Sequence, residues 1–366
     1  MKKKLKIEGV RMFPCIEINL NNILENFKIV QSICRKNDIH LAVVTKIFAD
    51  NIDIVSNLVN NGVEIICDSR IENLISYNNL NVQKWLIREP MISEISEVVK
   101  YSDVSLNTEI TTILALNEEA KKQNKIHKII LMYELGDLRE GCFESELESI
   151  IEQSLYLTNI EILGIGTNLS CYGEIIPTTE NMDEFISVVN KLEHKFNLKF
   201  EIISGGNSSS YKMLSEGKLP KKINNLRLGE SIFFGRVPCF EEEINYLNHN
   251  NFILKAQIIE LKEKPSVPWG EFGKTNSFGE TTEFEAKGIQ KRAIIGIGKQ
   301  DVRIEGITPL DSEIEILGGS SDHIILDLTN CSKYYKVGDI IEFKPTYASC
   351  LSAMTSKYVK RIIKEI

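Results

Sequence analysis

The chain has 366 residues, of which 43% are hydrophobic and 26% are charged, and its 51 Asp and Glu outnumber its 43 Lys and Arg to give a formal net charge of −8. This composition is typical of a globular protein, and the acidic surplus argues against binding to nucleic acid or to an anionic membrane through overall charge. No apolar run approaches the roughly 20 residues of a membrane span, and the start, MKKKLKIEGVRMFPC, lacks the apolar segment of a secretory signal.

Residues 40–235 alternate short β-branched runs with longer amphipathic segments. Strands are predicted at 41–46, 63–69, 84–89, 103–108, 128–136, 160–168, 200–207 and 224–235, and helices at segments such as 52–62, 110–123, 143–157 and 182–196. Eight such units in about 200 residues predict a (β/α)8 TIM barrel. A doubly wound open sheet is the alternative, but no G-x-G-x-x-G motif follows the first strand.

The pattern changes after residue 245, where strand-like runs are separated by turn residues and helical periodicity is weak. These runs lie at 252–264, 290–298, 312–319, 322–329, 336–344 and 358–366. We therefore expect a barrel domain over residues 14–243 and a C-terminal β-rich domain over residues 244–366, to which residues 1–13 also belong.

Cysteines and histidines are scattered along the chain. No C-x-x-C pair occurs among the eight cysteines, and no two of the five histidines stand at helical spacing. A disulfide framework is typical of short secreted chains, and a structural zinc site needs clustered ligands. We therefore expect a cytoplasmic protein without a metal site.

Lys46 ends the first predicted barrel strand, where Thr45 and Lys46 follow the apolar run LAVV. Functional residues of a (β/α)8 barrel lie at the carboxyl ends of the strands and in the loops that follow. Burial disfavours the charged form of an amine, which helps it to bond to a carbonyl carbon. The alternative is a lysine whose charged end simply extends into solvent.

Polar groups also follow the later strands. Arg139 lies after the fifth strand, where its guanidinium can bind a carboxylate through two parallel hydrogen bonds or form a surface ion pair. The turn SGGNSSS at 204–210 offers N–H groups and hydroxyls to a phosphate, with an ordinary helix cap as the alternative. The eighth strand carries Arg227, and Gly229 lets the backbone approach a phosphate closely. A reactive lysine, two arginines and a phosphate cradle fit an aldehyde that carries a phosphate, such as pyridoxal 5′-phosphate.

With these residues in place, the chain resembles the alanine racemase-like (fold-type III) pyridoxal-phosphate enzymes over almost its whole length. The motifs are PCIEINLNNILENF (14–27), VVTK (43–46), GIGTNLSCYGEIIPTTENM (164–182), SGGNSSS (204–210), NNLRLGESIFFGR (224–236), KPSVPWGE (264–271), GIGKQD (296–301) and ILGGSSDH (316–323). The last four resemble the ornithine racemase branch of the family rather than the alanine racemases proper.

The resemblance implies roles for three charged residues. Lys46 matches the lysine that holds the cofactor and transfers one proton at the substrate α-carbon. Arg227 matches the arginine that faces the pyridine nitrogen, where the decarboxylases of this fold have a glutamate, so it favours racemisation over decarboxylation. Arg139 matches the arginine near the cofactor phenolic oxygen and the substrate carboxylate.

Five further residues stand at positions where the family has cofactor contacts. Asn207, Ser208, Gly229 and Glu230 fall where the phosphate contacts lie, the last two through backbone N–H groups. Asn168 stands where alanine racemases have a histidine that faces the ring.

The chain also departs from the family pattern. Met132 replaces a lysine that is carbamylated in some relatives, and residues 47–51 lack the tyrosine of the lysine segment. The tyrosine that serves as second base from the partner subunit has no clear counterpart. Lys299 aligns with it approximately, and Tyr347 is the alternative.

The resemblance implies a racemase that interconverts L- and D-ornithine with two bases, as a head-to-tail homodimer. A side-chain ammonium would need a carboxylate, for which Glu271, Asp301 and Asp322 are candidates. The alternatives are a racemase of alanine, serine or lysine, a decarboxylase of the same fold, and a non-catalytic pyridoxal-phosphate carrier.

Overall fold

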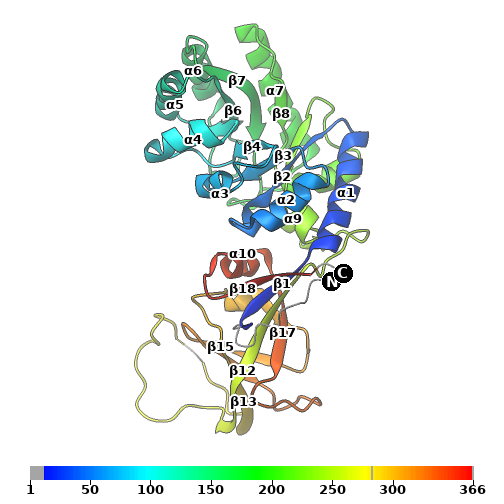
Figure 1. Cartoon of the computed structure of the whole chain (residues 1–366), viewed down its shortest axis with the longest axis vertical. Coiled ribbons are helices and arrows are strands. Elements are labelled where there is room, and N and C mark those ends of the chain that lie inside the picture. The colour runs from blue at the N-terminus through cyan, green and yellow to red at the C-terminus, as the bar shows by residue number, and fades with distance from the viewer. Residues whose placement is uncertain (1–11, 282, 365–366) are drawn as a thin grey trace, which may run out of the picture. The chain divides into compact units, whose positions relative to one another are not determined.

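The computed structural model describes residues 12–281 and 283–364 (Figure 1). The chain divides into two compact units, a barrel unit of Asn22–His249 and a β-rich unit formed by the described parts of Met1–Asn21 and Asn250–Ile366. The helices of the described residues are all too short or too polar to cross a bilayer.

Eight parallel strands close the barrel in the order β2-β3-β4-β5-β6-β7-β8-β9. They are β2 (His40–Val44), β3 (Ile65–Asp68), β4 (Gln83–Leu86), β5 (Val104–Asn107), β6 (His127–Tyr133), β7 (Ile160–Thr167), β8 (Ile202–Ser204) and β9 (Asn225–Leu228). The first and last strands pair directly, with Ala42 opposite Arg227. The predicted (β/α)8 barrel is therefore confirmed, and the open sheet is wrong.

Helices connect the barrel strands, as the amphipathic segments predicted (Figure 1). They are α1 (Leu20–Lys36), which leads into β2, and α2 (Ile52–Asn60), α3 (Ile71–Ser76), α4 (Ile95–Tyr101), α5 (Ile110–Lys122), α6 (Glu144–Ser154), α7 (Thr179–Phe196), α8 (Tyr211–Ser215) and α9 (Glu230–Phe233). A short hairpin of β10 (Arg236–Val237) and β11 (Glu242–Glu243) follows.

The barrel encloses an apolar core. Ala42, Val44, Cys67, Trp85 and further strand residues are buried together in one cluster. Burial of apolar area at roughly 25 cal/mol per Å² is the main stabilising contribution. A packed interior leaves the carboxyl ends of the strands as the place for polar chemistry.

The β-rich unit is built on an eight-stranded sheet with the main order β14-β17-β12-β13-β16-β15. Its strands are β1 (Cys15–Asn19), β12 (Phe252–Pro265), β13 (Ile289–Ile295), β14 (Ile307–Pro309), β15 (Glu315–Gly319), β16 (Ile324–Asp327), β17 (Ile340–Pro345) and β18 (Lys360–Lys364). The predicted β-rich C-terminal domain is therefore present.

Strand β1 differs from the predicted boundary at residue 14, which placed it in the barrel. It pairs in parallel with β18 and antiparallel with β12, and Figure 1 shows the blue strand alongside the red one. Its partners lie far along the chain, so no local pattern reveals them. The boundary after residue 243 differs less, because the barrel unit extends to His249.

Helix α10 (Tyr347–Thr355) is a second difference, since this stretch was not predicted as helix. The Thr346 hydroxyl accepts a hydrogen bond from the Ser349 N–H at 3.4 Å and caps its first turn. Small polar residues in YASCLSAMT weaken the apolar periodicity on which the sequence interpretation relies.

Candidate active site

Five predicted site residues lie at one end of the barrel unit. Lys46 follows β2, Arg139 follows β6 and Asn168 follows β7, whereas Ser208 follows β8 and Arg227 lies within β9. Because all eight strands are parallel and closed, their carboxyl ends form one face. The structure thus brings these residues to a common mouth.

Lys46 lies in a single 3₁₀ turn, η1 (Thr45–Phe48), at the end of β2. The buried Thr45 hydroxyl donates to the Cys67 carbonyl oxygen at 3.2 Å and ties this turn to β3. The lysine is partly buried and interacts electrostatically with Asp68 and Glu230. Burial raises the pKa of Asp68 to about 7, and the nearby Lys46 charge opposes that rise. Lys46 therefore lies near Asp68, the last residue of β3, and near Glu230, the first residue of α9.

Arg227 is buried inside the mouth, with 4% of its surface exposed. Its Nη2 donates to the Thr167 carbonyl oxygen at 2.8 Å, and its Nη1 donates to the Ser204 hydroxyl. Ser204 in turn donates to the Asn225 side chain. Burial lowers the pKa of Arg227, but a guanidinium stays charged in proteins. The barrel therefore presents a fixed cation at its mouth.

Ser208 lies at the centre of the predicted anion cradle. Its hydroxyl oxygen accepts hydrogen bonds from the N–H groups of Gly229 at 3.2 Å and Ser231 at 3.1 Å. A Cβ at Gly229 would lie 3.0 Å from the Val44 carbonyl oxygen, so the backbone passes closely there. Burial raises the pKa of Glu230, and its Oε1 lies 2.8 Å from Arg236 Nε.

Asn207 joins the loops after β7 and β8. Its Nδ2 donates to Asn168 Oδ1 at 3.0 Å and to the Leu169 carbonyl oxygen at 2.7 Å, while its Oδ1 accepts from the Ser209 N–H at 2.8 Å. Within the described residues, Asn168 Nδ2 and Ser209 Oγ are buried without a hydrogen-bond partner. Unsatisfied buried donors are costly, and an anionic ligand at the mouth would satisfy them. The residues present thus fit a phosphate-bearing cofactor.

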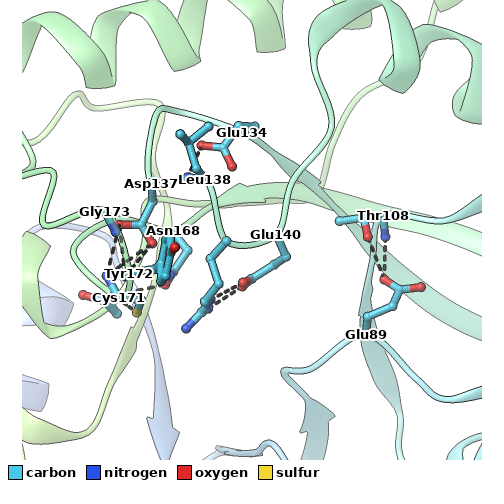
Figure 2. A network of polar contacts seen from close by, with 12 residues as sticks. Glu89, Thr108, Glu134, Asp137, Leu138, Glu140, Asn168, Cys171, Tyr172 and Gly173 are labelled. Carbon is cyan, nitrogen blue, oxygen red and sulfur yellow. Dashed lines mark hydrogen bonds and ion pairs between the residues drawn. The ribbon is translucent and has the colours of Figure 1, made fainter.

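Arg139 lies at the mouth in an ion pair with its neighbour in the sequence. Its guanidinium donates through Nε and Nη2 to the carboxylate of the next residue, Glu140. Figure 2 shows Glu140 among the polar groups that follow β6 and β7, with the Asp137 carboxylate beside Cys171 and Tyr172. Arg139 and Glu140 both contribute to the electrostatic environment of Arg227, so they lie near it.

The sequence interpretation missed Glu134, Asp137 and Glu140, although they stand in the same segment as Arg139. The signal was the charged run ELGDLREG directly after an apolar strand. The role of the acids depends on loop contacts that the run itself does not specify.

Both candidates for the second base belong to the β-rich unit. Lys299 Nζ lies within 2.6 Å of Glu280 Oε1 and 4.5 Å above the Phe278 ring. Tyr347 is the first residue of α10. The structure therefore assigns Lys299 to an ion pair and Tyr347 to a helix start, each in a different unit from Lys46.

The three acids suggested for a side-chain ammonium also lie in the β-rich unit. Asp301 is buried and accepts from the Ser356 hydroxyl at 2.7 Å. Asp322 is exposed and accepts from Ser321, and Glu271 lies in the exposed stretch between β12 and β13. Among the residues that the structure describes, no three His, Cys, Asp or Glu side chains are placed to hold a metal ion.

The fold and the mouth define a class, that of two-unit proteins in which a (β/α)8 barrel with a lysine and a buried arginine at its mouth is joined to a β-rich domain. Residues 18–237 match the family model described as the alanine racemase N-terminal domain. The chain belongs to the alanine racemase family.

Two curated relatives match almost from end to end. The chain is 46% identical over 351 residues to the ornithine racemase of Acetoanaerobium sticklandii, covering 96% of this chain and 99% of that protein. It is 37% identical over 353 residues to the lysine racemase of Thermotoga maritima, covering 96% and 98%.

Solved structures of alanine racemases share the fold. The Clostridium difficile 630 enzyme has a TM-score of 0.75 at 18% identity, covering 96% of this chain and 95% of that one. The Bartonella henselae enzyme, solved with covalently bound pyridoxal phosphate, has a TM-score of 0.72 at 18% identity, covering 96% and 99%.

Proposed function

We propose that this protein is a pyridoxal-phosphate-dependent racemase that interconverts L- and D-ornithine. The observation that carries the proposal is the 46% identity to an ornithine racemase over 96% of the chain. The mouth of the barrel supports it, because a lysine, a buried guanidinium and orphaned donors are the groups that such a cofactor needs.

The bound cofactor would supply an electron sink that acidifies the hydrogen on the substrate α-carbon. Lys46 would hold it and move one proton at that carbon. Asn168, Asn207, Ser208 and the N–H groups of Gly229 and Glu230 would contact its phosphate end and ring.

Arg227 would hold a positive charge against the ring nitrogen. A cation there discourages protonation of that nitrogen, so the α-carbon is reprotonated quickly and carbon dioxide is not lost. The Arg227 guanidinium supports this role because it is buried and makes two hydrogen bonds, which fix it before the substrate arrives.

Inversion needs a second base on the opposite face of the α-carbon, and general acid–base steps of this kind contribute roughly 10²–10⁴-fold each. We propose Lys299 for this role, with Tyr347 as the alternative. Comparing Lys299→Ala with Tyr347→Phe tests the choice, since loss of the second base slows proton exchange at one face more than at the other. If both substitutions lower the racemase activity equally, or if neither lowers it, the assignment of the second base is contradicted.

We also propose that the protein works in the cytoplasm as a head-to-tail homodimer in which the β-rich unit of one subunit completes the barrel mouth of the other. All eight cysteines are described and none forms a disulfide, which supports the location. Light scattering of the cofactor-loaded protein tests the dimer, which a mass of one chain would contradict.

The function is tested by polarimetry of L-ornithine with the cofactor-loaded protein, beside L-lysine and L-alanine. Decay of the rotation to zero for ornithine supports the proposal, and decay only for lysine would make lysine the substrate, as the 37% identical relative suggests. Release of a diamine would instead indicate a decarboxylase, and no reaction would indicate a carrier. Lys46→Ala should abolish racemisation, and undiminished activity would overturn the mechanism.

A further inference from the structure

Residues 134–141 form the loop that carries Arg139 and Glu140, and hydrogen bonds and close packing make this loop a frame for the pair. Glu134 Oε1 accepts hydrogen bonds from the N–H groups of Gly136 at 2.6 Å and Leu138 at 3.1 Å. Gly141 has a φ of +153°, and a Cβ there would lie 2.7 Å from the Glu134 backbone. The two ends of the loop are therefore packed against each other.

Asp137 fixes the same loop to its neighbour after β7. Its carboxylate, 2% exposed as a residue, accepts from the N–H groups of Cys171, Tyr172 and Gly173 at distances of 3.0 to 3.4 Å (Figure 2). A carboxylate that accepts several N–H groups is strongly bound. The frame thus positions the Arg139–Glu140 pair without using either of its side chains.

The pair itself is accessible. The Arg139 and Glu140 side chains are 41% and 27% exposed, and Glu140 takes up two donors of the Arg139 guanidinium. This is the arrangement in which a guanidinium binds a substrate carboxylate. Glu140 therefore occupies the guanidinium donors that a substrate carboxylate would use, so a substrate whose carboxylate binds Arg139, as the resemblance implies, would displace Glu140.

The other acids labelled in Figure 2 accept hydrogen bonds from backbone N–H groups. Glu134 and Asp137 hold the frame, and Glu89 accepts from the Thr108 N–H at 2.6 Å and from its hydroxyl at 3.2 Å. Burial raises the pKa of Glu89, although the bonds from Thr108 oppose the rise. Glu140 is the labelled acid that is paired with Arg139, the residue that the substrate carboxylate would bind.

We infer that Glu140 is a specificity-determining residue that binds the side-chain ammonium of a dibasic amino acid once the substrate carboxylate has displaced it from Arg139. The inference rests on the proposed function and adds to it the group that recognises the substrate side chain. A dibasic substrate breaks one ion pair and forms two. A substrate with an apolar side chain forms only one and leaves Glu140 without a cation.

The expected selectivity is moderate. A fully buried site that loses a polar partner discriminates by about 10⁴-fold or more, whereas exposed ion pairs contribute little. Glu140 is partly exposed, so water would solvate part of its charge. We therefore expect about 10- to 100-fold selectivity from this carboxylate, between those two limits.

The test compares Glu140→Gln with the wild-type protein on L-ornithine and on L-norvaline, which has the same carbon chain without the δ-amino group. The matched control is Glu148→Gln, because Glu148 forms a similar exposed ion pair with Lys195. We expect the ornithine-to-norvaline ratio of kcat/KM to fall at least about tenfold in Glu140→Gln, mainly through KM for ornithine, with the control unchanged. Glu140→Asp should restore part of the ratio.

Calorimetric binding of both amino acids to the same cofactor-loaded proteins separates this inference from the proposed function. Turnover of ornithine with an unchanged ratio in Glu140→Gln overturns the inference and leaves the racemase standing. Ornithine binding that depends on Glu140 without turnover overturns the racemase and supports the inference. Absence of both overturns both. A melting curve identifies any variant that is unfolded, and Glu140→Asp then serves as the test.

Discussion

Asp137→Asn removes the charge from the carboxylate that joins the loops after β6 and β7. An amide keeps one accepting oxygen and turns an NH₂ group toward the same three N–H donors, so at least one of them loses its partner. Hydrogen bonds to charged groups contribute about 1.5–3 kcal/mol each. Because Cys171, Tyr172 and Gly173 are exposed, water replaces part of this, and we expect a destabilisation of about 2 kcal/mol. For a barrel of this size, that lowers Tm by about 6 °C.

The measurement is a melting curve together with steady-state kinetics on the proposed substrate. Asp183→Asn is the control, because Asp183 is an exposed acid on the neighbouring helix α7. Since the frame positions Arg139, we expect Asp137→Asn to raise KM more than it lowers kcat. If the variant melts within about 1 °C of the control and has the same KM, the loop contacts do not position the site and the reasoning is refuted.

Three further predictions concern buried groups of the barrel unit. Arg227→Glu should slow racemisation and increase the share of diamine released from ornithine, measured by chromatography of the products. An unchanged ratio of diamine to D-ornithine contradicts the proposed role of the guanidinium. Gly229→Ala should destabilise the protein by about 1–3 kcal/mol and weaken binding of pyridoxal phosphate, because the new Cβ would lie 3.0 Å from the Val44 carbonyl oxygen. The control is Gly296→Ala, whose Cβ would lie 3.5 Å from its nearest neighbour. If both variants have the same Tm and the same cofactor affinity by fluorescence titration, the backbone at Gly229 does not form a tight cradle. Burial lowers the pKa of His127 from 6.5 to about 4. The contribution of the buried neutral His127 to the free energy of unfolding is therefore complete above pH 6.5 and is lost as the pH falls toward 4. His127→Gln should therefore remove up to about 3 kcal/mol of acid sensitivity in that window, as urea unfolding at several pH values would show; parallel wild-type and variant curves would contradict this.

The eight barrel strands were predictable because parallel strands buried on both faces read as continuous apolar runs. Residues 129–131 of β6, for example, are apolar and fully buried. Strand β1 was not predictable in the same way, because its partners β12 and β18 follow it by more than two hundred residues. A local pattern identifies a strand but not the sheet to which it belongs.

The candidate site divides along a similar line. Lys46 and Arg227 were found because a charged residue at the end of an apolar barrel strand is conspicuous in the sequence. The partners of Asp137 lie 34 to 36 residues away in another loop, so only the folded chain shows them. Glu140 is adjacent to Arg139 in the sequence, but its proposed role also depends on the loop contacts that place the pair at the mouth.

The division between fixed and exchangeable groups suits a reaction that must accept both enantiomers. Arg227 and Asp137 are buried and hydrogen-bonded to neighbouring strands and loops, so we expect both to keep their positions during the reaction. Inversion at the α-carbon moves the hydrogen from one face to the other and redirects the side chain. The Glu140 side chain is partly exposed, so we expect its carboxylate to follow a side-chain ammonium through that change. We therefore expect Glu140→Asp, with its shorter reach, to raise the KM for L- and D-ornithine by different factors, and equal factors measured by chiral chromatography would argue that Glu140 does not follow the side chain.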